Sequence, residues 1–258
     1  MNYDQDYCTN GFVQYDAALE LLTLIPFEPS NLLDIGCGSG KVTALICDQR
    51  KPCRVTGIDS SPVMIKEAQR LYPLPNVTYT ESSIEGLNTR DEFDVITSNS
   101  SFQWFRDYSK AFKNIRSSLT EDGVFVVQAS CRQQWCPTIN HLMDVFFDAL
   151  YPALKPHFHF PCMHLDSLDE YRQFFLTHGF TPSTLYIKEF EYQLSPDDFL
   201  KVFKSGGFKA YSYEQWFDVP LPESYTQNLL DYFEQFAVGK SCIPIVMPRL
   251  FAQLKPMS

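Results

Sequence analysis

LLDIGCGSGKVTALI, residues 32–46, passes from a short apolar run, through three closely spaced glycines, into a segment with helical spacing of apolar residues. Gly36, Gly38 and Gly40 allow positive φ and a close approach of the backbone to a ligand, as a strand-to-helix turn requires. Asp59 ends the next strand-like segment, 19 residues after Gly40. An acid at this distance can accept hydrogen bonds from ribose hydroxyls. The combination predicts a site for an adenosine-containing ligand.

Four interpretations of this loop stay open. A dinucleotide site prefers G-x-G-x-x-G, and here the third glycine comes one residue early. A P-loop needs G-x-x-x-x-G-K-[ST], but residues 36–41 are one residue short and Val42 replaces the hydroxyl that holds magnesium. S-adenosylmethionine has an amino-acid end that can accept backbone contacts, and its ammonium can approach an acid such as Asp34. The fourth is a tight turn without a ligand, which the position of Asp59 disfavours.

Strand and helix patterns alternate through the first half of the chain, which predicts a parallel sheet with right-handed crossovers. Apolar runs predict strands at 31–35, 54–59, 77–80, 93–98 and 124–129, and helical spacing predicts helices at 16–25, 41–49, 62–71 and 109–119. The second half breaks this rhythm: it predicts helices at 168–178, 196–204 and 223–237 and strands at 184–192 and 243–254. Residues 131–165, rich in proline and aromatic residues, receive no element.

Composition excludes several classes of partner. The chain has 258 residues and a formal net charge of −10, without a run of Lys and Arg, so counterion release from nucleic acid would not favour binding. We therefore expect no nucleic-acid partner. We also expect no membrane partner, because no apolar run approaches the ~20 residues of a membrane helix. Eight cysteines without a C-x-x-C pair indicate reduced thiols. The start of the sequence lacks signal-peptide features, and we expect a cytoplasmic protein.

Residues 31–130 resemble the class I S-adenosylmethionine-dependent methyltransferases. The resemblance rests on DIGCGSG at 34–40, on GIDSSPVM at 57–64 and on SNSSFQW at 98–104. The third motif is similar to a branch that contains the trans-aconitate and malonyl-[acyl-carrier protein] methyltransferases. Asn10 and Gly11, with the residues that follow, resemble the insect juvenile-hormone acid methyltransferases.

The resemblance implies a Rossmann-like fold, with a seven-stranded, mostly parallel sheet, helices on both faces and a helical lid. It divides the chain into a cofactor-binding core at 1–130, lid and substrate insertions with strand six at 131–242, and a closing strand at 243–258. It also implies a cofactor site for S-adenosylmethionine, formed by Asp34, Gly36, Cys37, Gly38, Ser39, Gly40, Asp59, Ser60, Met64, Ser83, Ile84 and Asn99. The chain departs from the family at Ser83, where an acid often precedes the adenine-contacting Ile84.

The relatives in that branch methylate carboxylates, and the sequence shows no obvious general base. A carboxylate is already ionised at pH 7, so catalysis can consist of holding its oxygen in line with the methyl group. The expected substrate is a small-molecule acid or an acid on an acyl carrier. Candidates for positioning it are Phe102, Gln103, Trp104, Arg106 and Arg132. Another substrate class (protein, RNA or a natural product) and a non-catalytic binding subunit remain the alternatives.

A separate cluster contains four potential metal ligands within eight residues: His157, His159, Cys162 and His164. Its spacing matches no familiar zinc site, and no second cluster completes it. We therefore expect no metal, and interpret the segment as an aromatic-rich lid with pH-sensitive histidines.

Overall fold

The computed structural model describes residues 12–26 and 28–257. Asn10 and Gly11 lie outside these ranges. The chain divides into two compact units. The sheet unit contains residues 12–133, 163–188 and 249 onward, and the helical unit contains, among the described residues, 134–162 and 189–248.

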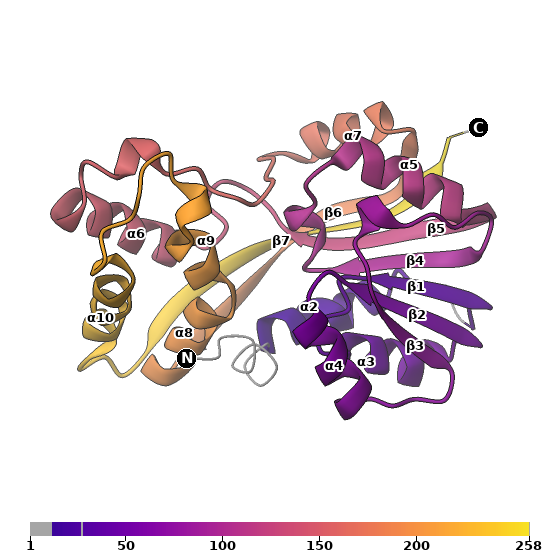
Figure 1. The fold of residues 1–258 in the computed structure, drawn as a ribbon, viewed down its shortest axis with the longest axis horizontal. Coiled ribbons are helices and arrows are strands. Elements are labelled where there is room, and N and C mark those ends of the chain that lie inside the picture. The colour runs from indigo at the N-terminus through magenta and orange to yellow at the C-terminus, as the bar shows by residue number, and fades with distance from the viewer. Residues whose placement is uncertain (1–11, 27, 258) are drawn as a thin grey trace. The chain divides into compact units, whose positions relative to one another are not determined.

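The sheet has seven strands in the order β3-β2-β1-β4-β5-β7-β6 (Figure 1). Their bounds are β1 Asn31–Ile35, β2 Arg54–Asp59, β3 Val77–Glu81, β4 Phe93–Asn99, β5 Leu119–Ser130, β6 Phe180–Leu194 and β7 Ile243–Pro256. Strands β1 to β5 pair in parallel, and β7 pairs with β5 in antiparallel fashion. The predicted α/β fold with a mostly parallel sheet is confirmed.

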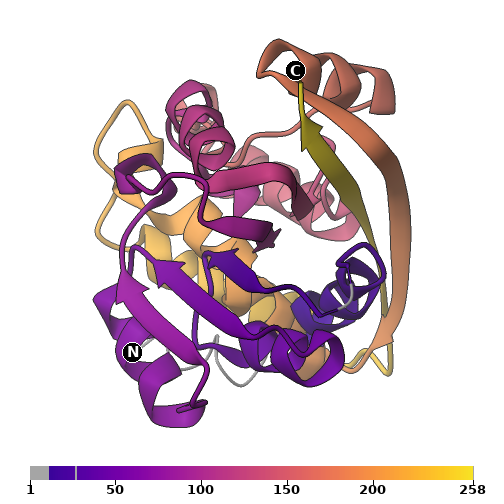
Figure 2. The same cartoon turned by 90° about the vertical axis from the view of Figure 1, so that its right-hand side faces the viewer.

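Helices cover both faces of the sheet unit. Figures 1 and 2 show α5 and α7 on one face and α2, α3 and α4 on the other. Strands β1 and β4 are buried along most of their length, as expected for parallel strands covered on both faces, although they carry buried polar residues as well as apolar ones. The bounds are α2 Phe12–Leu22, α3 Lys41–Arg50, α4 Pro62–Leu71, α5 Tyr108–Ser118 and α7 Leu168–Thr177, with single turns at Ile84–Gly86 and Phe102–Trp104.

The two faces of the central strands differ in chemistry. Phe125 and Val127 of β5 face the apolar core that also contains Phe112 of α5 and Phe175 of α7. Since successive side chains alternate between faces, Gln128 points to the opposite face. Parallel register places Asp34 beside Thr97, and Asn99 beside Gln128, on that same face. A polar row therefore lies on the α2–α3 face, toward the carboxyl ends of β1, β4 and β5.

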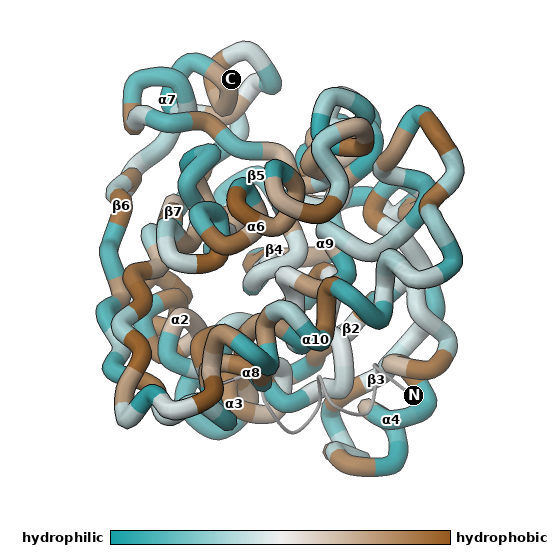
Figure 3. The backbone as a smooth tube through the Cα atoms, turned by 90° about the vertical axis from the view of Figure 1, so that its left-hand side faces the viewer, coloured by the Kyte–Doolittle hydropathy of each residue, from teal (hydrophilic) through white to brown (hydrophobic). Residues whose placement is uncertain are grey.

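The helical unit is built on aromatic packing. Phe203 stacks on Phe233 with ring centroids 3.6 Å apart, and Phe146 packs edge-on against Tyr225 at 5.7 Å. Hydrophobic and hydrophilic stretches alternate along α8 and α10 (Figure 3), as amphipathic helices require. Its helices are α6 Pro137–Leu150, α8 Pro196–Val202, α9 Phe208–Ser212 and α10 Tyr225–Ala237, with a π-helical turn at Phe203–Gly207 and single turns at Lys155–His157 and Glu214–Trp216.

The sequence prediction missed α6. Pro137 occupies the first turn, where its missing N–H costs nothing, and apolar side chains recur at Ile139, Leu142, Met143 and Phe146. The helical signal was present but obscured by neighbouring prolines and aromatic residues. Among the described helices, none is long and apolar enough to cross a membrane.

Candidate functional site

Asp59 joins the glycine-rich loop to the end of β2. Its Oδ2 accepts a hydrogen bond from the backbone N–H of Gly38 at 2.9 Å, and its Oδ1 accepts one from the N–H of Ser61 at 2.9 Å. A carboxylate offers about four lone-pair positions, so these two hydrogen bonds alone do not use all of them. The half-buried side chain therefore orders two loops at the carboxyl edge of the sheet.

The backbone donors of the loop are largely used within the protein. The N–H groups of Gly36 and Cys37 both donate to the carbonyl of Ile58, at 2.7 and 3.0 Å, and that of Gly40 donates to Cys37. With Gly38 bound to Asp59, four loop N–H groups point inward. A P-loop instead directs its N–H groups at phosphate oxygens. The geometry thus disfavours a phosphate cradle.

Two glycines are required by both conformation and space. Gly36 has φ of 71°, and a Cβ there would lie 2.3 Å from the Cβ of Ser101. Gly40 has φ of 82°, and its Cβ would lie 2.7 Å from the phenol oxygen of Tyr79. Positive φ is strained for residues with a Cβ, and contacts this short would displace the neighbours. The loop can hold this shape only with glycine.

Asp34, in β1 directly before the glycine loop, is hydrogen-bonded to side chains of α3 and β4. It is 1% exposed, and its oxygens accept hydrogen bonds from the hydroxyls of Thr43 at 2.6 Å and Thr97 at 3.0 Å. Burial raises the pKa of Asp34 to about 6; the two hydroxyls oppose this rise and the charge of Asp59 adds to it. The structure assigns Asp34 an internal role here, and contact with a ligand ammonium stays a prediction.

A buried group of amides follows β4. Asn99 Nδ2 donates to the carbonyl of Gln14 at 3.2 Å, Ser100 Oγ donates to Gln128 Oε1 at 2.7 Å, and Gln103 Nε2 donates to the carbonyl of Ser100 at 3.0 Å. Four further amide atoms of this group are buried without a hydrogen-bond partner: Asn99 Oδ1, Gln103 Oε1, Gln128 Nε2 and Gln14 Oε1. An unsatisfied buried polar atom costs about 1–3 kcal/mol, so a ligand that bonds these atoms would recover that energy.

Backbone strain coincides with this group. Ser100 has φ of 57°, in the left-handed region that L-residues avoid. Its N–H donates to the carbonyl of Gln128 at 2.9 Å, so β5 holds the strained residue in place. Such strain persists where the surrounding structure enforces it and is common at functional sites. The chain therefore turns sharply at the carboxyl end of β4.

The residues expected near the adenosine lie on the other side of the loop. Ile84 and Met64 are 2% and 6% exposed, and Ser60 and Ser83 are exposed. Ser83 Oγ accepts a hydrogen bond from the N–H of Gly86 at 3.2 Å, so it caps the turn that positions Ile84. Two further predicted contacts, Cys37 and Ser39, lie within the glycine loop and are buried.

The proposed substrate-positioning residues have different surroundings. Phe102 is completely buried among aromatic rings and belongs to the core. Gln103 belongs to the buried amide group, whereas Trp104 is 37% exposed and Arg106 is exposed. Arg132, partly buried and with φ of 65°, follows β5. Among these five residues, the structure places only Gln103 in the amide group.

A family model matches the central segment of the chain. Residues 33–127 match the model described as a methyltransferase domain. We refer to these residues as the methyltransferase domain after this match. It contains the glycine loop, Asp59 and Asn99.

Two relatives extend the comparison. Over 138 residues the chain is 39% identical to trans-aconitate 2-methyltransferase of Escherichia coli O6:K15:H31, covering 52% of this chain and 53% of that enzyme. It is 36% identical over 137 residues to trans-aconitate 2-methyltransferase of Escherichia fergusonii, again covering 52% and 53%. The chain thus spans about half the length of the curated relatives it matches.

Solved structures show the same fold. The YcgJ protein from Bacillus subtilis is 16% identical with a TM-score of 0.60, covering 95% of this chain and 99% of that one. The cyclopropane synthase MmaA2 from Mycobacterium tuberculosis is 18% identical with a TM-score of 0.54, covering 92% of this chain and 82% of that one. At these identities the similarity concerns the fold alone.

The histidine cluster lies outside the methyltransferase domain. His159 Nε2 lies 2.7 Å from Asp218 Oδ2, and His157 Nδ1 lies 3.9 Å from the same oxygen. Cys162 is buried, and His164 lies beyond it in the sheet unit. Within residues 12–26 and 28–257, no group of three or more His, Cys, Asp or Glu side chains is arranged to hold a metal ion.

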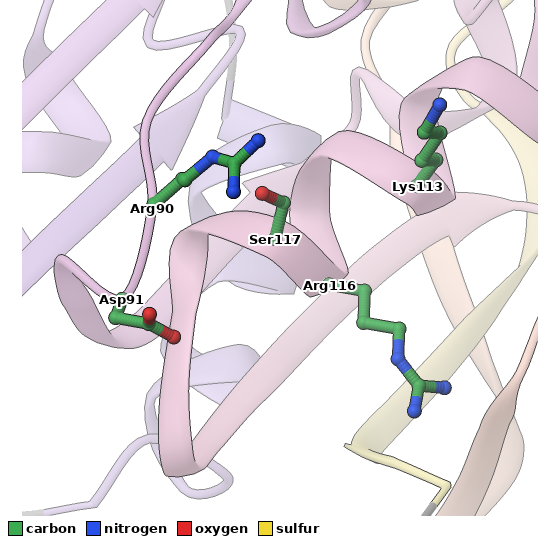
Figure 4. Close-up of a pocket in the computed structure, with 5 residues that line it drawn as sticks. All are labelled: Arg90, Asp91, Lys113, Arg116 and Ser117. Atoms are coloured by element: carbon green, nitrogen blue, oxygen red, sulfur yellow. The ribbon is translucent and has the colours of Figure 1, made fainter.

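A surface pocket of about 370 Å³ lies at the opposite edge of the methyltransferase domain from the glycine loop. It is lined by Arg90, Asp91, Lys113, Arg116 and Ser117 (Figure 4). The first two residues precede β4, and the other three lie on α5 ahead of β5, so the pocket is at the amino ends of these strands. Ligands of open α/β sheets bind at the carboxyl ends, and this pocket is therefore separate from the candidate site.

Sequence reasoning assigned no role at the site to three polar residues at the carboxyl edge: Gln14, Gln128 and Arg249. Gln128 and Arg249 are 0% and 4% exposed. For Gln128 and Arg249 the available signal was one polar residue within an otherwise apolar run, VFVVQA at 124–129 and IVMPRLFA at 245–252, because burial of such a group needs a compensating partner.

Proposed function

We propose that this protein is an S-adenosylmethionine-dependent methyltransferase that methylates a carboxylate of a small-molecule acid. The observation that carries the proposal is the unsatisfied amide group at the end of β4, beside the glycine loop of a methyltransferase domain. S-adenosylmethionine, when bound, supplies a methyl group on a sulfonium: an acceptor oxygen lone pair forms the new O–C bond, the C–S electron pair stays on sulfur, and no proton moves.

The described residues fit this cofactor. The carboxylate of Asp59 is an acceptor of the kind that suits ribose hydroxyls, and the inward-pointing N–H groups of the loop suit a ligand without phosphate there. Asn99 Oδ1 and Gln14 Oε1 are buried acceptors that suit the ammonium of the cofactor. The buried Ile84 and Met64 offer apolar surface near an adenine.

The acceptor is inferred from what the amide group can do chemically. Its members are the amides of Gln14, Asn99, Gln103 and Gln128, which cannot take up a proton at neutral pH. An alcohol or an ammonium would have to lose a proton before or during transfer, and this group offers no base for it. A carboxylate is already ionised. The names of the bacterial relatives, trans-aconitate 2-methyltransferase, point to the same class of acceptor.

The first experiment is isothermal titration calorimetry with S-adenosylmethionine and S-adenosylhomocysteine, with NAD as control. Binding of the first two without binding of NAD supports the cofactor assignment. Methyl transfer is then measured with labelled S-adenosylmethionine on trans-aconitate, laurate and a malonyl-acyl carrier protein, with product identified as a base-labile methyl ester. Absence of cofactor binding, or transfer only to amines or RNA, would refute the proposal.

A further inference from the structure

Arg249 is a buried cation at the candidate site. It lies on β7, directly opposite Ser130 of β5 in the antiparallel pair, and its side chain is 4% exposed. The antiparallel register places this residue at the carboxyl end of β5, on the face of the sheet that also carries Gln128.

Gln128 is the neighbour of Arg249 on the same face of the sheet. Register pairs Gln128 with Phe251, two residues from Arg249, so the two side chains are diagonal neighbours. Gln128 is completely buried, and while its Oε1 accepts from Ser100 Oγ, its Nε2 has no partner. The amide NH₂ of Gln128 is therefore a donor without a partner next to the residue that carries the Arg249 guanidinium.

These donors fit one chemical class. A guanidinium and an amide NH₂ present only N–H groups, and an ionised carboxylate presents only acceptors. Arginine binds carboxylates through two parallel hydrogen bonds. A carboxylate of a ligand would satisfy the Gln128 donor and lie next to the positive charge.

The strand order separates this place from the cofactor. Asp59 ends β2, and the order β2-β1-β4-β5-β7 puts Arg249 four strands away, roughly 19 Å at about 4.8 Å per strand. A cofactor with its ribose at Asp59 would extend along the loop toward Asn99 on β4. The edge formed by β5 and β7 lies on the far side of β4 from Asp59, so an acceptor bound there would not compete with the cofactor.

We propose that Arg249 and Gln128 bind a carboxylate of the methyl acceptor. The inference rests on the proposed function, and it deepens it by assigning the residues that select an acid over a neutral molecule. Arg249 supplies the charge, and Gln128 fixes the orientation of the carboxylate on the sheet.

The test uses the full chain, saturating S-adenosylmethionine, and whichever of trans-aconitate and laurate wild-type protein methylates faster. Arg249→Gln should raise KM for that acid at least about tenfold, since hydrogen bonds to charged groups are being removed. Affinity for S-adenosylhomocysteine should stay within about threefold, because the cofactor lies elsewhere. Arg249→Lys should recover part of the loss, and Gln128→Glu should raise KM further through charge repulsion. Arg116→Gln, which removes an exposed arginine that hydrogen-bonds the carbonyl of Met257, is the control and should leave KM unchanged.

The outcomes separate the two proposals. If wild-type protein binds no S-adenosylhomocysteine or methylates neither acid, the proposed function and this inference both fail. If wild-type protein is active and Arg249→Gln leaves KM unchanged, or weakens S-adenosylhomocysteine without affecting KM, only the carboxylate assignment fails. Arg249→Lys and Gln128→Leu, checked for folding by circular dichroism, keep the test decisive if Arg249→Gln does not fold.

Discussion

The backbone N–H of Gly38 donates to Asp59 Oδ2 across 2.9 Å, linking residues 21 positions apart in the chain. The same carboxylate accepts from the N–H of Ser61, so one side chain binds both the glycine loop and the residue that precedes α4. At the amino ends of the strands, Asp94 likewise binds two backbone N–H groups: it accepts from Ser30 and Asn31, where β1 begins, at 2.7 and 2.8 Å.

These two carboxylates provide a matched pair of variants. Asp59→Asn and Asp94→Asn each weaken two hydrogen bonds to backbone N–H groups, so both should lower the free energy of unfolding by about 1–3 kcal/mol. Only Asp59→Asn should weaken binding of S-adenosylhomocysteine, by at least about tenfold. Calorimetry and chemical denaturation measure both quantities. Equal affinity in the two variants would remove Asp59 from the ligand site.

The glycine loop makes a second prediction, on stability. Gly36→Ala combines a positive φ with a Cβ placed 2.3 Å from Ser101, and we expect a loss of about 3 kcal/mol or more. Gly179→Ala has a similar φ of 79°, but its Cβ meets only the flexible end of Arg116 at 3.1 Å. Its loss should be about 1 kcal/mol, from conformation alone. Equal losses of stability in thermal unfolding would show that Ser101 moves away from the added Cβ at little cost in free energy.

The fold was predictable because its signals are local. The glycines at 36, 38 and 40, the apolar run of β1 and the position of Asp59 all lie within 28 residues of one another, and each predicts the same strand–loop–helix unit. Local sequence patterns are less decisive where residues typical of helices and residues typical of loops occur together. In α6 the apolar spacing was overshadowed by nearby prolines and rings, and the helix was missed.

The polar group at the carboxyl edge was less predictable. Gln128 and Arg249 are 121 positions apart, and only the antiparallel register of β5 and β7 makes them neighbours. A single sequence does not contain that register. Phe102 shows the converse limit: its position after β4 suggested contact with substrate, but only the three-dimensional packing reveals that its ring is enclosed by other rings.

Two buried tyrosines allow a third prediction. The hydroxyl of Tyr79 is buried beside the glycine loop without a hydrogen-bond partner, whereas the hydroxyl of Tyr171 accepts from the N–H of Leu165 at 3.2 Å. Removing an unsatisfied hydroxyl relieves its desolvation cost, so Tyr79→Phe should raise the free energy of unfolding by about 1 kcal/mol. Tyr171→Phe should lower it by a similar amount. Urea denaturation measures both, and a destabilised Tyr79→Phe would contradict the assignment of an unpaired hydroxyl.

The buried carboxyl of Asp34 makes the last prediction, which concerns pH. Its pKa is raised from 3.8 to about 6, chiefly by burial. An acid whose pKa is higher in the folded chain binds its proton more readily when folded, so its contribution to stability falls as pH rises through this interval. Asparagine at this position does not titrate.

The free energy of unfolding of wild-type protein, relative to Asp34→Asn, should therefore fall by roughly 2–3 kcal/mol between pH 4 and pH 7. Thr43→Val is the complementary variant: it removes a hydroxyl that donates to Asp34 at 2.6 Å, which should raise the pKa further and move the fall to higher pH. Denaturant titrations at several pH values measure the difference. A relative stability that rises with pH would mean that the folded chain favours ionised Asp34, as it would if the hydrogen bonds from Thr43 and Thr97 outweighed burial.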